Sequence, residues 1–149
     1  LWMVDRHHRL RGLYGLDPHA SAWGYVIAEP AVSDPQEVLA FLEAKGWLYL
    51  VDGRGNGPRM AAELPGSLLD LDDDPYRSLV WKLKKEGFIK PQPQIPYHEF
   101  RWGAWLRRRP LPPFSSRSLE PALAPARRLV CSPAASDMAG WRGDKKACR

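Results

Sequence analysis

No run of about 20 apolar residues occurs in the sequence, so it does not predict a membrane-spanning helix. The mean hydropathy is −0.43 over 149 residues. We therefore expect a soluble protein, or one that associates with a membrane only at its surface.

Cysteine is scarce, and both cysteines, Cys131 and Cys148, lie near the end of the chain. Two cysteines do not form a disulfide scaffold, and this spacing matches no zinc-binding motif. We expect two free thiols in a reducing compartment.

The motifs of the common catalytic and cofactor sites are missing. There is no Gly-x-Ser-x-Gly, and the glycine-rich stretch 52–58 lacks the Gly-Lys-Ser/Thr of a phosphate-binding loop. The aspartates of 70–74 do not have calcium-loop spacing, and the adjacent His7 and His8 do not suit one metal ion. The sequence predicts no enzyme activity, no cofactor and no metal.

Proline, tryptophan and positive charge are all more frequent than usual. Fifteen prolines make up twice the average share of roughly 5%. Lysine and arginine outnumber aspartate and glutamate by 22 to 17, which mildly favours anionic partners. Seven tryptophans are too many for the core of so proline-rich a chain. We expect some of them to face a partner.

Two helices have complete start and stop signals. Asp74 before Pro75 is typical of a helix start, and Gly87 ends a helix predicted over 75–86. A second helix is predicted over 35–45, with Ser33 or Asp34 as its cap and Gly46 as its stop.

Strands are predicted elsewhere in the first half of the chain. Trp23, Tyr25 and Ile27 alternate within 21–28, which is typical of a strand. The apolar run 47–51 predicts a short buried strand.

The two ends of the chain show no sustained hydrophobic period, although 97–109 has room for one or two helical turns. The prediction is an α+β fold, with a small core of two or three helices, a few short strands, and long extended N- and C-terminal arms. The predicted regions are a basic N-terminal arm (1–20), the α+β core (21–90) and a Pro/Arg-rich extended C-terminal region (91–149).

Two clusters of basic and aromatic residues are the candidate contact sites. On a helical wheel of 75–86, Trp81 lies among basic residues on the face opposite an apolar stripe, which consists of Tyr76, Leu79, Val80 and Leu83. Arginine binds phosphate and tryptophan stacks on bases, but the same residues also suit a protein partner. The candidate contact residues are Arg77, Trp81, Lys84, Lys85, Arg101, Trp102, Trp105, Arg107, Arg108 and Arg109.

These features predict a non-catalytic structural subunit of a large assembly, foremost an organellar (mitochondrial) ribosome, with neighbouring proteins and rRNA as partners. One alternative is an accessory subunit of a mitochondrial respiratory-chain or ATP synthase complex. Another is a winged-helix-like nucleic-acid-binding module. Because the sequence starts at Leu1 rather than Met, we expect a mitochondrial location after removal of a targeting segment.

Overall fold

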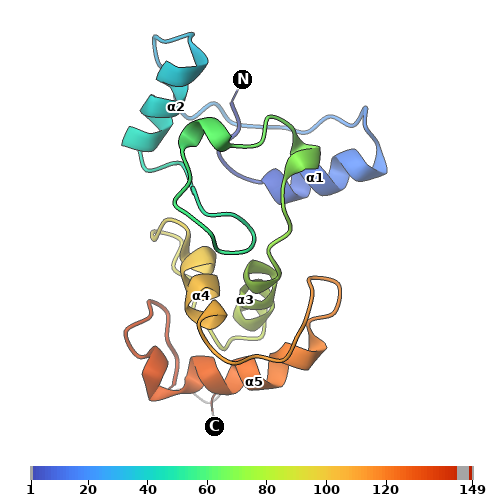
Figure 1. Cartoon of the computed structure of the whole chain (residues 1–149), viewed down its shortest axis with the longest axis vertical. Helices are drawn as coiled ribbons and strands as arrows, with labels where there is room; N and C mark the ends of the chain where they lie inside the picture. The colour runs from blue at the N-terminus through green and yellow to red at the C-terminus, as the bar shows by residue number, and fades with distance from the viewer. Residues whose placement is uncertain (1, 144–147, 149) are drawn as a thin grey trace. The chain divides into compact units, whose positions relative to one another are not determined.

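A computed structural model describes residues 2–143 and 148 of the chain (Figure 1). Two compact units form, one from residues 1–52 and 56–72 and the other from 53–55 and 73–149. The helices are α1 (His7–Leu16), α2 (Pro35–Ala44), α3 (Pro75–Lys85), α4 (His98–Arg107) and α5 (Glu120–Cys131). Three short 3-10 turns are η1 (Ala61–Glu63), η2 (Leu68–Asp70) and η3 (Pro133–Ala135).

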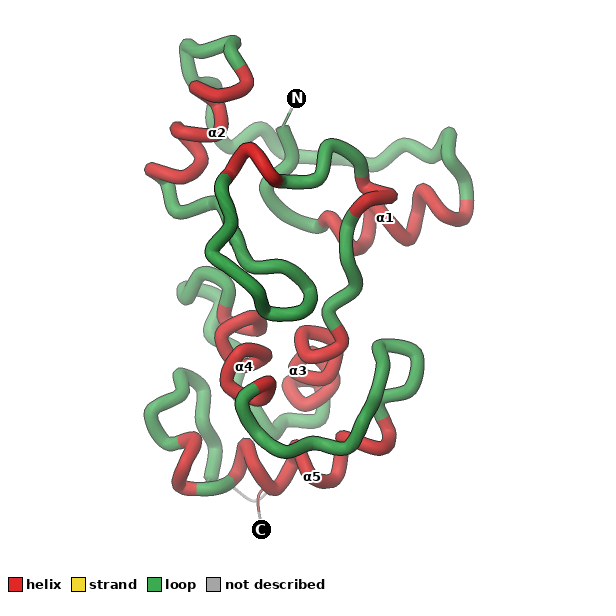
Figure 2. The backbone as a smooth tube through the Cα atoms, in the orientation of Figure 1, coloured by secondary structure: helices red, strands yellow, loops and turns green. Residues whose placement is uncertain are grey.

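The predicted α+β class is wrong, because the described residues contain five α-helices and no strand (Figure 2). The stretch 21–28 is extended but has no neighbouring strand, and Trp23 and Tyr25 are 104% and 96% exposed. A strand needs a hydrogen-bonded ladder with a partner. The stretch 47–51 is not a strand either: Trp47 N donates to Leu42 O at 2.9 Å at the end of α2, and the Leu50 carbonyl accepts from Arg59 N at 2.7 Å across a turn.

The first unit contains α1 and α2. The sequence predicted an extended arm at 1–20, but α1 forms there. The helix was missed because Gly12 and Gly15, which lower helix propensity, lie within α1. The helix α2 is confirmed: Asp34 Oδ1 accepts from Gln36 N at 2.8 Å. Its buried side chains are Val38 and Leu42.

The helix α3 is confirmed with the predicted signals at both ends. Asp74 Oδ1 accepts from Arg77 N at 3.0 Å, which caps the first turn. Gly87 has φ +85°, and Phe88 N donates to Leu83 O at 3.0 Å, as in a Schellman stop. Leu79, Val80 and Leu83 of its apolar stripe are fully buried.

The extended C-terminal region was also predicted wrongly, because it contains α4 and α5. In the second unit α3 and α4 lie side by side, and α5 crosses them (Figure 1). The prediction failed at α5 because its buried face is made largely of alanine and because it contains Pro121 and Pro125. Pro121 lies in the first turn, where backbone N–H groups have no acceptor within the helix, so a proline there removes no hydrogen bond. The buried residues of α5 are Ala122, Leu123, Ala126 and Val130.

The cysteines pair, which contradicts the prediction of free thiols. Cys131 ends α5 and forms a disulfide with Cys148, with their Cα atoms 5.4 Å apart.

No helix in the described part of the chain is long and apolar enough to cross a membrane.

Candidate nucleic-acid interface

One face of α4 carries a basic groove. Arg101, Trp105 and Arg108 recur at intervals of four and three residues, so they share a side of the helix. They line a cavity of about 820 Å³ together with the loop 137–139. The lining residues are His98, Arg101, Trp102, Ala104, Trp105, Arg108, Arg109, Asp137, Met138 and Ala139.

Arg109 is fixed against Trp105 at the end of α4. Its guanidinium carbon lies 3.1 Å from the ring centroid, and Nη1 donates to Trp105 O at 2.5 Å. Burial lowers the pKa of Arg109, and the positive charge of Arg108 lowers it further. An arginine side chain still carries its charge at neutral pH, so Arg109 holds a cation at a fixed position in the groove.

The opposite wall of the groove is anchored by the carbonyl of Ala139. This oxygen accepts from His98 Nε2 at 2.8 Å and from Trp102 Nε1 at 2.9 Å. Next to it, Gly140 O accepts from Lys90 N at 2.8 Å. Since His98 and Trp102 are both buried, these bonds hold the loop 137–140 against α4.

The charge of the groove is largely uncompensated. Among the described residues, Arg101, Arg108 and Arg109 form no ion pair, and Asp137 is the one carboxylate among the lining residues. Other arginines of this unit are neutralised locally: Arg127 Nη2 lies 2.9 Å from a Glu86 oxygen. The groove is therefore suited to an anion.

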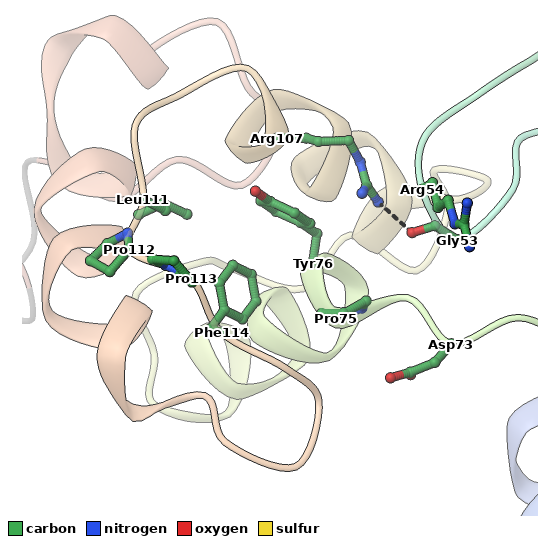
Figure 3. A pocket seen from close by; sticks show the side chains of 10 residues that line it. All are labelled: Gly53, Arg54, Asp73, Pro75, Tyr76, Arg107, Leu111, Pro112, Pro113 and Phe114. Atoms are coloured by element: carbon green, nitrogen blue, oxygen red, sulfur yellow. Dashed lines mark hydrogen bonds between the residues drawn. The ribbon is translucent and has the colours of Figure 1, made fainter.

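A second cavity, of about 460 Å³, lies at the start of α3 (Figure 3). Arg107 Nη2 donates to Asp74 Oδ1 at 3.0 Å and to Gly53 O at 3.1 Å. The Arg107 guanidinium also lies over the ring of Tyr76, 4.4 Å from its centroid, and Tyr76 packs edge-on against Phe114 at 4.9 Å. The lining residues are Gly53, Arg54, Asp73, Pro75, Tyr76, Arg107, Leu111, Pro112, Pro113 and Phe114.

Four predicted contact residues, Arg101, Trp105, Arg108 and Arg109, come together in the basic groove. Trp102 also lines it, but its side chain is fully buried in the core.

The remaining predicted contact residues lie elsewhere. Arg77 and Lys84 both form ion pairs with Glu99 of α4, and Arg107 lines the second cavity. Trp81 is 44% exposed with Lys85 Nζ 5.6 Å from its ring, and neither residue lines the basic groove or the second cavity.

Several lining residues were not predicted from the sequence. His98 belongs to no motif in the sequence, and Asp137 lies in the region that was expected to be extended. The described residues hold no group of three or more His, Cys, Asp or Glu side chains placed to share a metal ion.

A family model described as "Putative ParB-like nuclease" matches residues 1–108. The chain belongs to this family. The match includes α1 to α4 and therefore the α4 side of the groove.

The chain is also similar to a solved structure, the crystal structure of protein Atu1540 from Agrobacterium tumefaciens. The two are 28% identical, with a TM-score of 0.79, over 94% of this chain and 71% of that one. No curated protein matches the sequence.

Proposed function

We propose that this protein binds nucleic acid, as a single strand, in the basic groove along α4. The observation that carries the proposal is the set of three unpaired arginines, Arg101, Arg108 and Arg109, around Trp105 in one cavity. Membership of a family described as ParB-like nucleases supports a nucleic-acid ligand.

The chemistry of the groove matches the two repeating parts of a strand. Guanidinium groups bind phosphate oxygens through two parallel hydrogen bonds, and the exposed Arg101 and Arg108 are free to do so. The half-buried Trp105 lines the same groove as an aromatic side chain for contact with a base, and Arg109 covers one face of its ring. A positive channel with an aromatic platform is the usual form of a single-strand site.

Binding of a fluorescein-labelled dT12 strand, followed by fluorescence anisotropy, tests this proposal. Each arginine that neutralises a phosphate contributes about 0.7 to the slope of log K against log salt for a single strand. The double variant R101A/R108A is therefore expected to weaken binding more than tenfold and to reduce the slope by about 1.4.

The matched control is R117A/R128A, which removes the same charge from two exposed arginines that line neither cavity. It should change the affinity less than threefold. Equal losses in the two double variants would show that net charge, and not the groove, binds the strand. Binding of a labelled 12-base-pair duplex, measured in the same way, shows whether the protein prefers a single strand to a double strand.

A second candidate function is cleavage of the bound strand, and the family description is the observation that favours it. Incubating labelled dT12 with the protein, with and without Mg²⁺, and resolving the products on a gel tests it. Cleavage that R101A/R108A slows would assign a nuclease that uses the groove. An intact strand after complete binding would agree with the non-catalytic protein predicted from the sequence.

The assembly and location stay predictions. Neither the family description nor the name of the similar Agrobacterium protein refers to a ribosome, a respiratory complex or a mitochondrion.

A further inference from the structure

We propose that the second cavity, at the start of α3, holds one unstacked nucleotide of the strand whose neighbouring phosphates lie in the basic groove. This inference rests on the proposed function and adds a position that receives a base.

The helix α4 connects the two sites. Arg107 lines the second cavity and Arg108 lines the groove. Consecutive residues of an α-helix point about 100° apart, so the end of α4 presents one arginine to each site. The two cavities are therefore lined by arginines that are neighbours in the chain, Arg107 and Arg108, at the end of α4.

The second cavity has an apolar wall on which a base can lie. Phe114 is half-buried, the neighbouring Pro112 and Pro113 are exposed, and Tyr76 packs edge-on against the Phe114 ring (Figure 3). Aromatic rings stack on any base, because every base has a flat π face. The volume of about 460 Å³ falls within the range of small-molecule sites, roughly 300–1,000 Å³.

Arg107 supplies hydrogen-bond donors for the nucleotide. A guanidinium has five N–H groups, and Arg107 uses Nη2 for Asp74 and for the Gly53 carbonyl. Its Nε and Nη1 form no hydrogen bond with any described residue, and neither nitrogen is fully buried. These donors therefore remain accessible to a ligand.

The charges around the cavity balance one another, with two arginines, Arg54 and Arg107, beside two carboxylates, Asp73 and Asp74. Asp74 is buried as the cap of α3, where Arg107 and the Arg77 N–H already compensate it. The exposed Asp73 accepts from Ser116 Oγ at 2.8 Å. Arg54 adds a second cation to the lining. This balance does not suit a run of phosphates, so the cavity is suited to the base of one nucleotide, while the neighbouring phosphates lie in the basic groove.

The test replaces Phe114 and measures dT12 binding by anisotropy. Phe114→Leu keeps an apolar side chain but removes the flat ring, and it should weaken binding about tenfold. Phe114→Trp keeps a stacking face and should stay within about twofold of the unchanged protein. Circular dichroism of each variant confirms that the helices are retained.

The outcomes separate this inference from the proposed function. If Phe114→Leu binds dT12 normally while R101A/R108A still binds weakly, the cavity holds no nucleotide and the groove proposal stands. If neither variant changes binding, both proposals fail.

A free nucleotide has the same chemistry, and NMR signals of the Tyr76 and Phe114 rings distinguish it. We expect dT12 to shift these signals at lower concentration than thymidine 5′-monophosphate. Shifts with the mononucleotide that dT12 does not reproduce would assign the cavity to free nucleotides and overturn the strand proposal.

Discussion

Arg107 Nη2 lies 3.0 Å from Oδ1 of Asp74, the residue that caps α3, so one ion pair joins the end of α4 to the start of α3. Both side chains are largely buried, with exposures of 23% and 10%. Removing one partner from such a pair leaves the other charge without compensation, which is more costly than losing the attraction alone.

We therefore expect Arg107→Ala to lower the free energy of unfolding of the second unit by about 3 kcal/mol. Asp74→Asn should cost less, about 1 kcal/mol, because asparagine still caps a helix. Urea unfolding followed by far-UV circular dichroism measures both. Arg117→Ala is the control for a surface arginine. If Arg107→Ala lowers the free energy of unfolding no more than Arg117→Ala does, the ion pair between Arg107 and Asp74 does not stabilise the second unit.

Trp81 and Trp102 form a matched pair of tryptophans on adjacent helices. Trp102 is fully buried, and replacing it by alanine should cost about 3–5 kcal/mol through the cavity that it leaves. Trp81 is 44% exposed, so Trp81→Ala should change the free energy of unfolding by no more than about 0.5 kcal/mol. Similar losses of unfolding free energy in the two variants would show that the Trp81 side chain is packed in a hydrophobic core.

The disulfide Cys131–Cys148 should stabilise the second unit. It closes a loop of 17 residues, and the chain-entropy model predicts about 3 kcal/mol for a loop of this size. Reduction by dithiothreitol should therefore lower the melting temperature. The double variant C131S/C148S should melt at the lower temperature with or without the reductant. A melting temperature that reduction leaves unchanged would show that the bond does not constrain the unfolded chain.

Tyr97 should make stability depend on alkaline pH. Burial raises the pKa of Tyr97 above its ordinary value of 10.0, because the phenolate loses solvation. The folded state then favours the neutral phenol. The contribution of the neutral Tyr97 phenol to the free energy of unfolding is complete below pH 10 and is lost as the pH rises through the folded-state pKa. Urea unfolding between pH 8 and 11 should show a steeper decline for the unchanged protein than for Tyr97→Phe. Equal slopes would contradict the prediction.

Helices with local signals could be predicted from the sequence. The caps Asp34 and Asp74 and the stops Gly46 and Gly87 each act within one turn, so α2 and α3 were located correctly. The helix α5 could not be located in this way. Its alanine-rich stripe becomes a core face only where α3 and α4 cover it, and that packing is not visible in local sequence.

The candidate site was likewise predicted only on one side. The arginines and Trp105 of α4 stand out by composition, so this wall was found. The other wall, around Asp137 and Met138, comes from a distant part of the chain that returns to α4 through long-range hydrogen bonds. The strand predicted at 21–28 was wrong for a related reason. Alternating apolar residues indicate that a segment is suited to pairing in a sheet, but they do not show that a partner strand exists.

The carbonyl of Ala139 has a consequence for the chemistry of His98. A carbonyl oxygen only accepts, so the hydrogen on His98 Nε2 must be the one that is donated. The neutral ring is thereby held in a single tautomer, with Nδ1 as the acceptor nitrogen. One hydrogen bond thus fixes both the tautomer of a buried histidine and the position of the loop that forms the wall of the groove.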